Sequence, residues 1–247
     1  MLIRLGYRGG VIENINVEDN YFEVYGYGSL IKFGSKGVER VNNIRVTNNT
    51  IKYHKIDGEG FSLFQIDNTE GQNIQVDSNV ISIDSEINER IAGSCLVGEN
   101  IDFLNNKVTI DYNLAYLAIR GGNFCNNDIK ISGNLNNFFI YTNNSLTKNI
   151  KISNNKFEIN DSESWNKREK IFLGLQNTYL NGFYILINEN TLTLSNNQEL
   201  PQTFVNFNSI NDETVQKVYS YNNNLGIFTE IINYMNNIEH IVINQMP

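Results

Sequence analysis

The sequence predicts an all-β fold, a single-stranded parallel β-helix in which each turn of the coil supplies about three strands. Three observations lead to this prediction. A short pattern of alternating apolar residues returns eight times, an asparagine holds the same place in every copy, and a second apolar strand follows most copies. Alternation with period two indicates β-strands, and self-similarity at a period of about 20 to 50 residues is typical of solenoids.

The repeat reads Asn-Ile-x-Val-x-x-Asn-x-Ile-x-Ile in its clearest form. Its copies span residues 14–24, 43–53, 73–83, 100–110, 121–131, 149–159, 184–194 and 217–227. The central asparagines are Asn20, Asn49, Asn79, Asn106, Asn127, Asn155, Asn190 and Asn223. The first and last lie 203 residues apart over seven steps, a mean of 29. We therefore expect about eight turns of roughly 29 residues.

Each copy predicts two short strands, with a turn at the polar pair before the central asparagine. The third strand of each turn is expected within residues 29–34, 61–66, 94–98, 116–121, 138–142, 171–176 and 203–208. No repeat contains a convincing amphipathic helix, and the two-residue hairpin signals of a sandwich do not recur. Equivalent strands of successive turns should therefore pair in parallel.

Asparagine makes up 44 of the 247 residues, about 18%. Stacked at one position per turn, the eight central side chains can hydrogen-bond to one another along the coil as a ladder. Asparagine also tolerates the left-handed backbone that a sharp turn between strands requires. A ligand contact is the alternative role for these residues, and the structural role is favoured.

The chain reads as a single β-helix domain over residues 1–247, because no linker divides it. Residues 1–9 form a lead-in without an obvious helix cap, and 229–247 are expected to form a partial ninth turn or a capping strand. A solenoid needs its ends covered. We therefore expect either that the sequence is a piece of a longer protein or that another chain covers its N-terminal end.

Composition excludes several classes of function. The net charge of −8 and the lack of a basic block argue against nucleic-acid binding. No apolar run is long enough for a membrane span or a signal peptide. The cysteines and histidines, two of each, match no metal-binding or cofactor-binding motif, so we predict no metal and no cofactor.

The stacked NIxVxxNxIxI copies resemble the repeats of right-handed parallel β-helix proteins of the pectate-lyase-like superfamily, which includes many phage tailspikes. The resemblance covers residues 10 to 228 and implies the fold and its right hand, which agrees with the usual hand of parallel crossovers. The catalytic motifs of that superfamily do not occur here, so the resemblance transfers no catalytic residue.

Carboxylates on neighbouring turns lie about 4.8 Å apart, close to the spacing of a retaining glycosidase pair. The loops after the asparagine-bearing strands gather acids beside aromatic and basic side chains, a composition that suits a sugar groove. The candidate catalytic residues there are Asp57, Glu59, Asp84 and Glu86. The candidate binding residues there are Tyr53, His54, Arg90 and Tyr112. The alternative is an ordinary solvated acidic face.

A second candidate surface is the outward face of the third strands. It adds the binding candidates Asp67, Arg120 and Tyr141, and the exposed-looking loop 160–170 adds Trp165. A lyase would use cations near the substrate, for which Lys55, Arg90 and Arg120 are candidates. Alternation also places Leu96 and Phe139 outward, as an apolar patch that would favour oligomeric packing.

Three functions follow as expectations. The first is a glycan-recognising module of a phage or prophage tailspike or tail fibre, located on the virion tail or outside the cell. It binds bacterial surface polysaccharide, with or without cleaving it, as a homo-oligomer, with a trimer favoured. The second is a freestanding polysaccharide lyase or glycoside hydrolase. The third is a non-catalytic structural or adhesive solenoid.

Overall fold

A computed structural model describes 19 stretches of the chain, and these contain 25 strands and no helix. The described residues are 3–5, 10–26, 29–33, 40–56, 62–66, 72–86, 94–98, 101–112, 114, 117–119, 122–133, 138–142, 149–159, 171–176, 184–194, 202–208, 216–224, 228–233 and 238–242. The prediction of an all-β fold is confirmed.

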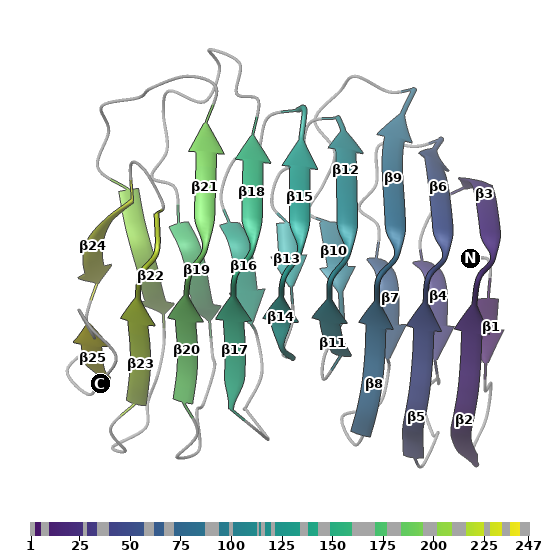
Figure 1. Cartoon of the computed structure of the whole chain (residues 1–247), viewed down its shortest axis with the longest axis horizontal. Coiled ribbons are helices and arrows are strands. Elements are labelled where there is room, and N and C mark those ends of the chain that lie inside the picture. The colour runs from purple at the N-terminus through teal and green to yellow at the C-terminus, as the bar shows by residue number, and fades with distance from the viewer. Residues whose placement is uncertain are drawn as a thin grey trace.

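The strands form three sides of a coil, and neighbouring strands within each sheet pair in parallel across successive turns. Figure 1 shows the strands of the first two sides side by side in front of the third, with the turns stacked along the molecule. The first side is a nine-stranded sheet: β2 (Val11–Glu18), β5 (Arg40–Thr47), β8 (Gln72–Asp77), β11 (Ile101–Leu104), β14 (Phe124–Cys125), β17 (Ile150–Ser153), β20 (Tyr184–Asn188), β23 (Gln216–Tyr221) and β25 (Ile238–Val242).

The second side is a seven-stranded sheet: β3 (Tyr21–Gly26), β6 (Thr50–Lys55), β9 (Val80–Ser85), β12 (Lys107–Asp111), β15 (Asp128–Ile131), β18 (Lys156–Ile159) and β21 (Thr191–Leu194). The third side has two parts. The first part is β1 (Ile3–Leu5), β4 (Ser29–Phe33), β7 (Ser62–Ile66), β10 (Ser94–Val97) and β13 (Leu117–Ile119). The second part is β16 (Phe138–Thr142), β19 (Ile171–Gln176), β22 (Gln202–Asn208) and β24 (Phe228–Asn233).

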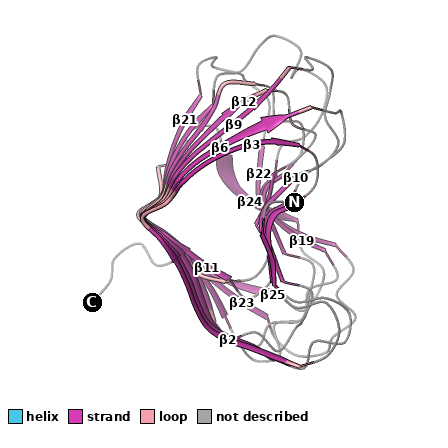
Figure 2. Ribbon diagram, turned by 90° about the vertical axis from the view of Figure 1, so that its right-hand side faces the viewer, coloured by secondary structure: helices cyan, strands magenta, loops and turns pink. Residues whose placement is uncertain are grey.

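The coil is right-handed. Seen from the N-terminal end, the chain passes from β2 through a sharp corner to β3 and returns down the third side as it recedes, a clockwise path (Figures 1 and 2). The predicted hand is therefore confirmed. The nine-stranded sheet holds one strand more than the eight predicted turns, because β25 pairs with β23 beyond the last turn that carries a ladder asparagine.

The corner between the first two sides holds the predicted asparagine ladder. Asn49 donates to Oδ1 of Asn79 twice, from its backbone N–H at 2.9 Å and from Nδ2 at 3.0 Å. This double contact recurs at all seven steps from Asn20 to Asn223. The Nδ2 of Asn79 also donates to the backbone carbonyl of Val46, 2.8 Å away in the preceding turn. The ladder thus connects three successive turns at each interior rung, from Asn49 to Asn190.

The left-handed residue of each corner is the one before the ladder asparagine, not the asparagine itself as the sequence had suggested. These residues have φ between 52° and 58°: Asp19, Asn48, Ser78, Asn105, Asn126, Asn154, Glu189 and Asn222. Some form a second, exposed ladder, in which Asn126 donates to Asn105 at 3.1 Å and Asn154 donates to Asn126 at 2.9 Å. Asparagine is favoured at this place because its short polar side chain tolerates positive φ.

The core is a column of inward-facing apolar side chains, one layer per turn. At its centre Phe103 and Phe124 stack with ring centroids 5.4 Å apart, and Phe64 and Phe157 continue the stack on either side. Gly122 occupies an apolar slot of the repeat because a Cβ there would lie 1.9 Å from the carbonyl oxygen of Ile101. The close approach of the preceding turn's backbone to Gly122 therefore explains why the fifth repeat departs from the pattern.

One expectation about the outer surface is wrong. Leu96 neighbours the inward-facing Val97, so alternation directs it outward, yet it is 0% exposed. Leu30 and Leu63 occupy the equivalent places on β4 and β7 and are also fully buried. Leu96 therefore does not contribute to an exposed apolar patch. The side chain of Phe139 lies outside the described part of the chain.

We predict that Asn106→Ala lowers the free energy of unfolding by about 1–3 kcal/mol, because the change leaves buried ladder partners without their hydrogen bonds. Urea unfolding followed by circular dichroism measures the loss. Asn16→Ala is the control, because Asn16 is exposed and its side chain hydrogen-bonds only with Glu18 among the described residues. This change should shift stability by less than about 0.5 kcal/mol. Equal effects of the two changes would contradict the ladder's role.

We also predict that Gly122→Ala destabilises the protein by about 1–3 kcal/mol, since the new methyl group forces the backbone of the preceding turn to move. Gly26→Ala is the matched control, because a Cβ there meets no atom within 4 Å. Loss of glycine flexibility from the unfolded chain should leave that variant neutral or slightly more stable. Thermal unfolding of the two variants would refute the explanation if both melted like the wild type.

Candidate functional site

The outer face of the seven-stranded sheet carries rows of side chains that run along the coil. The strand register places Tyr25, His54, Asp84 and Asp111 side by side on β3, β6, β9 and β12. Each stands five residues after the ladder asparagine of its turn. Because the ladder fixes the height of every strand, residues about 30 positions apart in sequence become neighbours on the surface.

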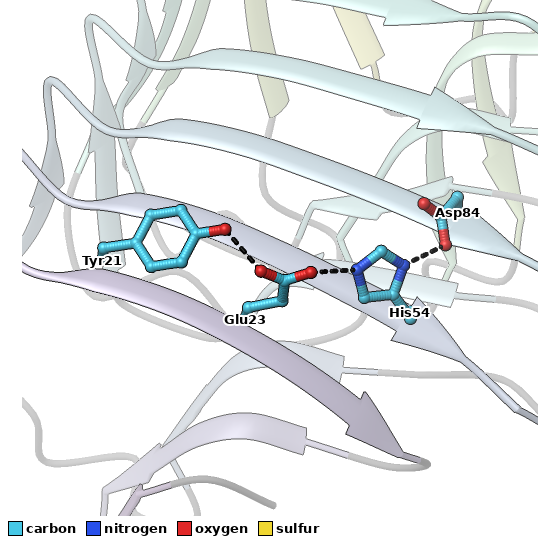
Figure 3. Close-up of polar contacts among 4 residues, drawn as sticks. All are labelled: Tyr21, Glu23, His54 and Asp84. Carbon is cyan, nitrogen blue, oxygen red and sulfur yellow. Dashed lines mark hydrogen bonds and ion pairs between the residues drawn. The ribbon is translucent and has the colours of Figure 1, made fainter.

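His54 is the centre of this row. Its Nδ1 lies 2.7 Å from Oδ1 of Asp84, a distance at which Nδ1–H donates to the carboxylate. On the other side its Nε2 lies 3.4 Å from Oε1 of Glu23. The imidazole therefore lies between carboxylates from the preceding and following turns, as Figure 3 shows. With its side chain 21% exposed, the ring has a fixed orientation and still reaches the surface.

Glu23 belongs to a second polar group beside His54. The hydroxyl of Tyr21 donates to Oε2 of Glu23 at 2.5 Å, and Nζ of Lys52 lies 5.7 Å from the centre of the Tyr21 ring. The Tyr21 hydrogen bond, with smaller contributions from His54 and Lys52, lowers the pKa of Glu23. The contacts with Tyr21 and Glu23 raise the pKa of Lys52. Both side chains are thus held in their charged forms.

Tyr25 provides an aromatic surface next to these charges. Its ring stacks on His54 with centroids 4.4 Å apart and planes inclined by 19°, yet the residue remains 64% exposed. An aromatic ring held on one face and open to solvent suits the apolar face of a flat, hydroxylated ligand. The adjacent carboxylates of Glu23 and Asp84 can accept hydrogen bonds from the hydroxyl groups of such a ligand.

Asp84 and Asp111 form an acidic pair on adjacent strands. They are register partners on β9 and β12, and both side chains reach the outer face. Adjacent strands lie about 4.8 Å apart, which is close to the separation of about 5–5.5 Å between the two carboxyl groups of retaining glycosidases. The row thus combines an aromatic platform, an oriented imidazole and two neighbouring carboxylates.

The structure brings together some of the candidates from the sequence and separates others. It joins His54 to Asp84, and it places the exposed Glu86 immediately after β9. Other candidates lie outside the described residues: Asp57, Glu59, Asp67, Arg90, Arg120 and Trp165. Tyr141 is part of β16, but its side chain also lies outside the described part.

Three residues named from the sequence lie in the interior. Tyr53 is 1% exposed and Tyr112 is 5% exposed, because both face the core, so neither belongs to the outer row. Lys55 is 0% exposed, which removes it from the surface cations available to a lyase. Strand alternation explains the position of Tyr53, since the inward residues of β6 are Ile51, Tyr53 and Lys55.

The sequence reasoning missed Tyr21, Glu23 and Lys52 as members of the site. The signal that could have found them is the distance from the ladder asparagine. Residues one, three and five positions after it face outward, so Tyr21, Glu23 and Tyr25 follow directly from Asn20. The candidates from the sequence were chosen by the loops in which they lie, and this common spacing from the ladder asparagine was not used.

No three His, Cys, Asp or Glu side chains within the described stretches form a group that could hold a metal ion. The same stretches contain no helix of the length and apolar character needed to cross a membrane. Comparisons with protein-family models, with curated proteins and with solved structures find no match to this chain.

We predict that Tyr21→Phe raises the pKa of Glu23 toward the ordinary glutamate value of about 4.3, since the change removes the hydroxyl that stabilises the carboxylate. A lowered pKa in the folded protein contributes stability above the unfolded-state pKa, and this contribution is lost as the pH falls through the folded-state pKa. In the variant the contribution is therefore smaller, and its loss is complete at a higher pH.

Carboxyl carbon shifts of Glu23, followed by NMR during an acid titration, measure the change. Tyr184→Phe serves as the control, because Tyr184 lies on β20 in a different sheet. An unshifted Glu23 titration in Tyr21→Phe would contradict the assigned cause.

Proposed function

We propose that this chain is a glycan-recognising β-helix module of a phage or prophage tailspike or tail fibre, which binds bacterial surface polysaccharide on the outer face of its seven-stranded sheet. One observation carries the proposal: the row of Tyr25, His54, Asp84 and Asp111, in which an exposed ring lies beside oriented polar groups. The row crosses four strands, a length of about 14 Å at the usual strand spacing, so it suits an extended chain of sugars.

The chemistry of the row supports a sugar rather than another ligand. A pyranose presents an apolar face to an aromatic ring and hydroxyl groups to carboxylates. The negative charge of the chain disfavours a nucleic acid. The repeat's resemblance to the pectate-lyase-like β-helices agrees with a site on the virion tail or outside the cell and with assembly as a homo-oligomer, a trimer in the tailspikes.

Glycoside hydrolysis is a second candidate function, favoured by the register pairing of Asp84 with Asp111. In a retaining mechanism one carboxyl group protonates the leaving oxygen and the other attacks the sugar. Of the cations named from the sequence for a lyase, Lys55 is buried and so cannot serve on this surface. A purely structural solenoid would leave the exposed ring of Tyr25 without a ligand.

We predict that Tyr25→Ala weakens polysaccharide binding about tenfold or more, which corresponds to about 1.4 kcal/mol, because exposed tyrosines that stack on a ligand are typical hot spots. Pulldown with a panel of bacterial surface polysaccharides first identifies the ligand, and titration of the variant then measures the loss. Tyr184→Ala is the matched control, as Tyr184 is an exposed tyrosine on another sheet. Absence of binding to every glycan, or equal losses in the two variants, would overturn the proposal.

The same incubations test cleavage. New reducing ends that disappear in Asp84→Asn and Asp111→Asn, while binding persists, would support hydrolysis. Reducing ends that persist in both variants would exclude this pair, and unsaturated products absorbing in the ultraviolet would indicate a lyase instead. Binding without products would leave a receptor-binding module.

A further inference from the structure

The imidazole of His54 is hydrogen-bonded on one side and not on the other. Its Nδ1 lies 2.7 Å from Oδ1 of Asp84 and forms a hydrogen bond. Its Nε2 lies 3.4 Å from Oε1 of Glu23 (Figure 3), yet this nitrogen is buried and forms no hydrogen bond within the described part of the chain. A buried polar atom without a partner costs free energy. The unsatisfied atom of the site thus faces a carboxylate.

Neither neutral tautomer of His54 satisfies both sides of the ring. A neutral imidazole has one N–H and one lone pair, and an ionised carboxylate only accepts hydrogen bonds. With the proton on Nδ1, the lone pair of Nε2 faces Glu23. With the proton on Nε2, the lone pair of Nδ1 lies 2.7 Å from Asp84. The imidazolium, which has an N–H on each nitrogen, is the form that can donate to both carboxylates.

Glu23 does not supply the missing proton. The hydroxyl of Tyr21 donates to its other oxygen, Oε2, at 2.5 Å. This hydrogen bond is the largest cause that lowers the pKa of Glu23, and His54 and Lys52 lower it further. Glu23 therefore stays ionised over the pH range in which histidines ordinarily titrate. A proton that enters this contact as the pH falls binds to His54.

The titratable groups around the His54 ring come from four neighbouring strands. Within the described residues they are Glu23 and Tyr25 on β3, Lys52 on β6, Asp84 on β9 and, one strand further, Asp111 on β12. The carboxylates outnumber the single ammonium, that of Lys52, which also interacts with Glu23. Nearby opposite charges favour the charged form of a group. The surroundings therefore favour a positive charge on the ring.

Protonation of His54 also changes how firmly Tyr25 is held. The two rings stack with centroids 4.4 Å apart and planes inclined by 19°. A cation over the face of a tyrosine is attracted by the ring's quadrupole, an attraction that a neutral imidazole lacks. The imidazolium is in addition tied to β3 through Glu23 and to β9 through Asp84. The proton therefore fixes the exposed ring on which the proposed glycan stacks.

We infer that His54 is a proton-dependent positioning residue, which when protonated joins Glu23 to Asp84 and holds Tyr25 in place, so that glycan affinity rises as the pH falls from about 8 to about 5.5. The inference rests on the proposed function, because the ligand is the same glycan at the same row. Ordinary carboxyl groups titrate below this pH range. The imidazole is therefore the group of the site that changes charge.

The positioning of Tyr25 can be tested without a ligand. The chain has two histidines, His54 and His240, so His240→Gln leaves one imidazole to follow by nitrogen NMR. As its Nε2 gains a proton between pH 8 and pH 5.5, the amplitude of Tyr25 ring motion, measured by carbon relaxation, should fall at least twofold. In His54→Gln the amplitude should be the same at both pH values. Ring motion that does not follow the protonation of His54 would overturn the inference.

Glu23→Gln tests the contact itself. Glutamine keeps the shape of the side chain and an oxygen for the Tyr21 hydroxyl, and its amide can donate to Nε2 of a neutral imidazole. Tyr25 should therefore be as firmly held at pH 8 in this variant as it is at pH 5.5 in the wild type. Ring motion in Glu23→Gln that still falls twofold on acidification would show that the Glu23 contact is not the cause, and would overturn the inference.

Glycan affinity tests the consequence for the proposed function. The polysaccharide retained in the pulldown should bind the wild type at least threefold more tightly at pH 5.5 than at pH 8. His240→Gln, a change on β25 in a different sheet, should keep this ratio, and His54→Gln and Glu23→Gln should bring it close to one. Binding of the wild type with a ratio near one would overturn the inference and leave the proposed function standing. Failure to bind any glycan would overturn the proposed function, and the motion of Tyr25 would then decide the role of His54.

Discussion

The double hydrogen bond onto each ladder Oδ1 is the constraint on which the rest of the structure depends. The oxygen accepts the backbone N–H and the Nδ2 of one asparagine together, so adjacent asparagines must stand at the same height in successive turns. A slip of one residue would turn every inward side chain outward. The ladder therefore fixes the register of the sheets on both sides of the corner. Turn length varies from 21 to 35 residues without breaking it.

This fixed corner also determines the chemistry of the outer face. An outward position keeps its offset from the ladder asparagine in every turn, so each repeat contributes one side chain to each row. Tyr25, His54, Asp84 and Asp111 share an offset of five, and they combine into a site although no two lie close in sequence. The buried ladder and the exposed row therefore depend on the same register. The residues of the row can differ between turns while the ladder residue remains asparagine.

The sequence predicted the features that follow from the length of the repeat and from the alternation of inward and outward side chains. The strands, the parallel pairing and all eight ladder positions could be predicted from the two-residue alternation and the 29-residue mean period. The right hand was predicted from the resemblance to parallel β-helix proteins and from the usual hand of parallel crossovers. The site could be predicted in part: His54 and Asp84 were named, but their contact with Glu23 requires counting from Asn20. Leu96 could not be predicted, because alternation gives the direction of a side chain and not what lies over it.

Hydrogen bonds give the stack a direction as well as a register. Each turn donates to the next through its ladder asparagine, and the two faces of a turn are complementary rather than identical. A turn that ran in the antiparallel sense could still align its strands with those of its neighbours. It would not present an amide N–H and an Nδ2 together to the next Oδ1, since that pair of donors comes from one residue at one corner in the parallel sense. The ladder therefore requires successive turns to run in the same direction.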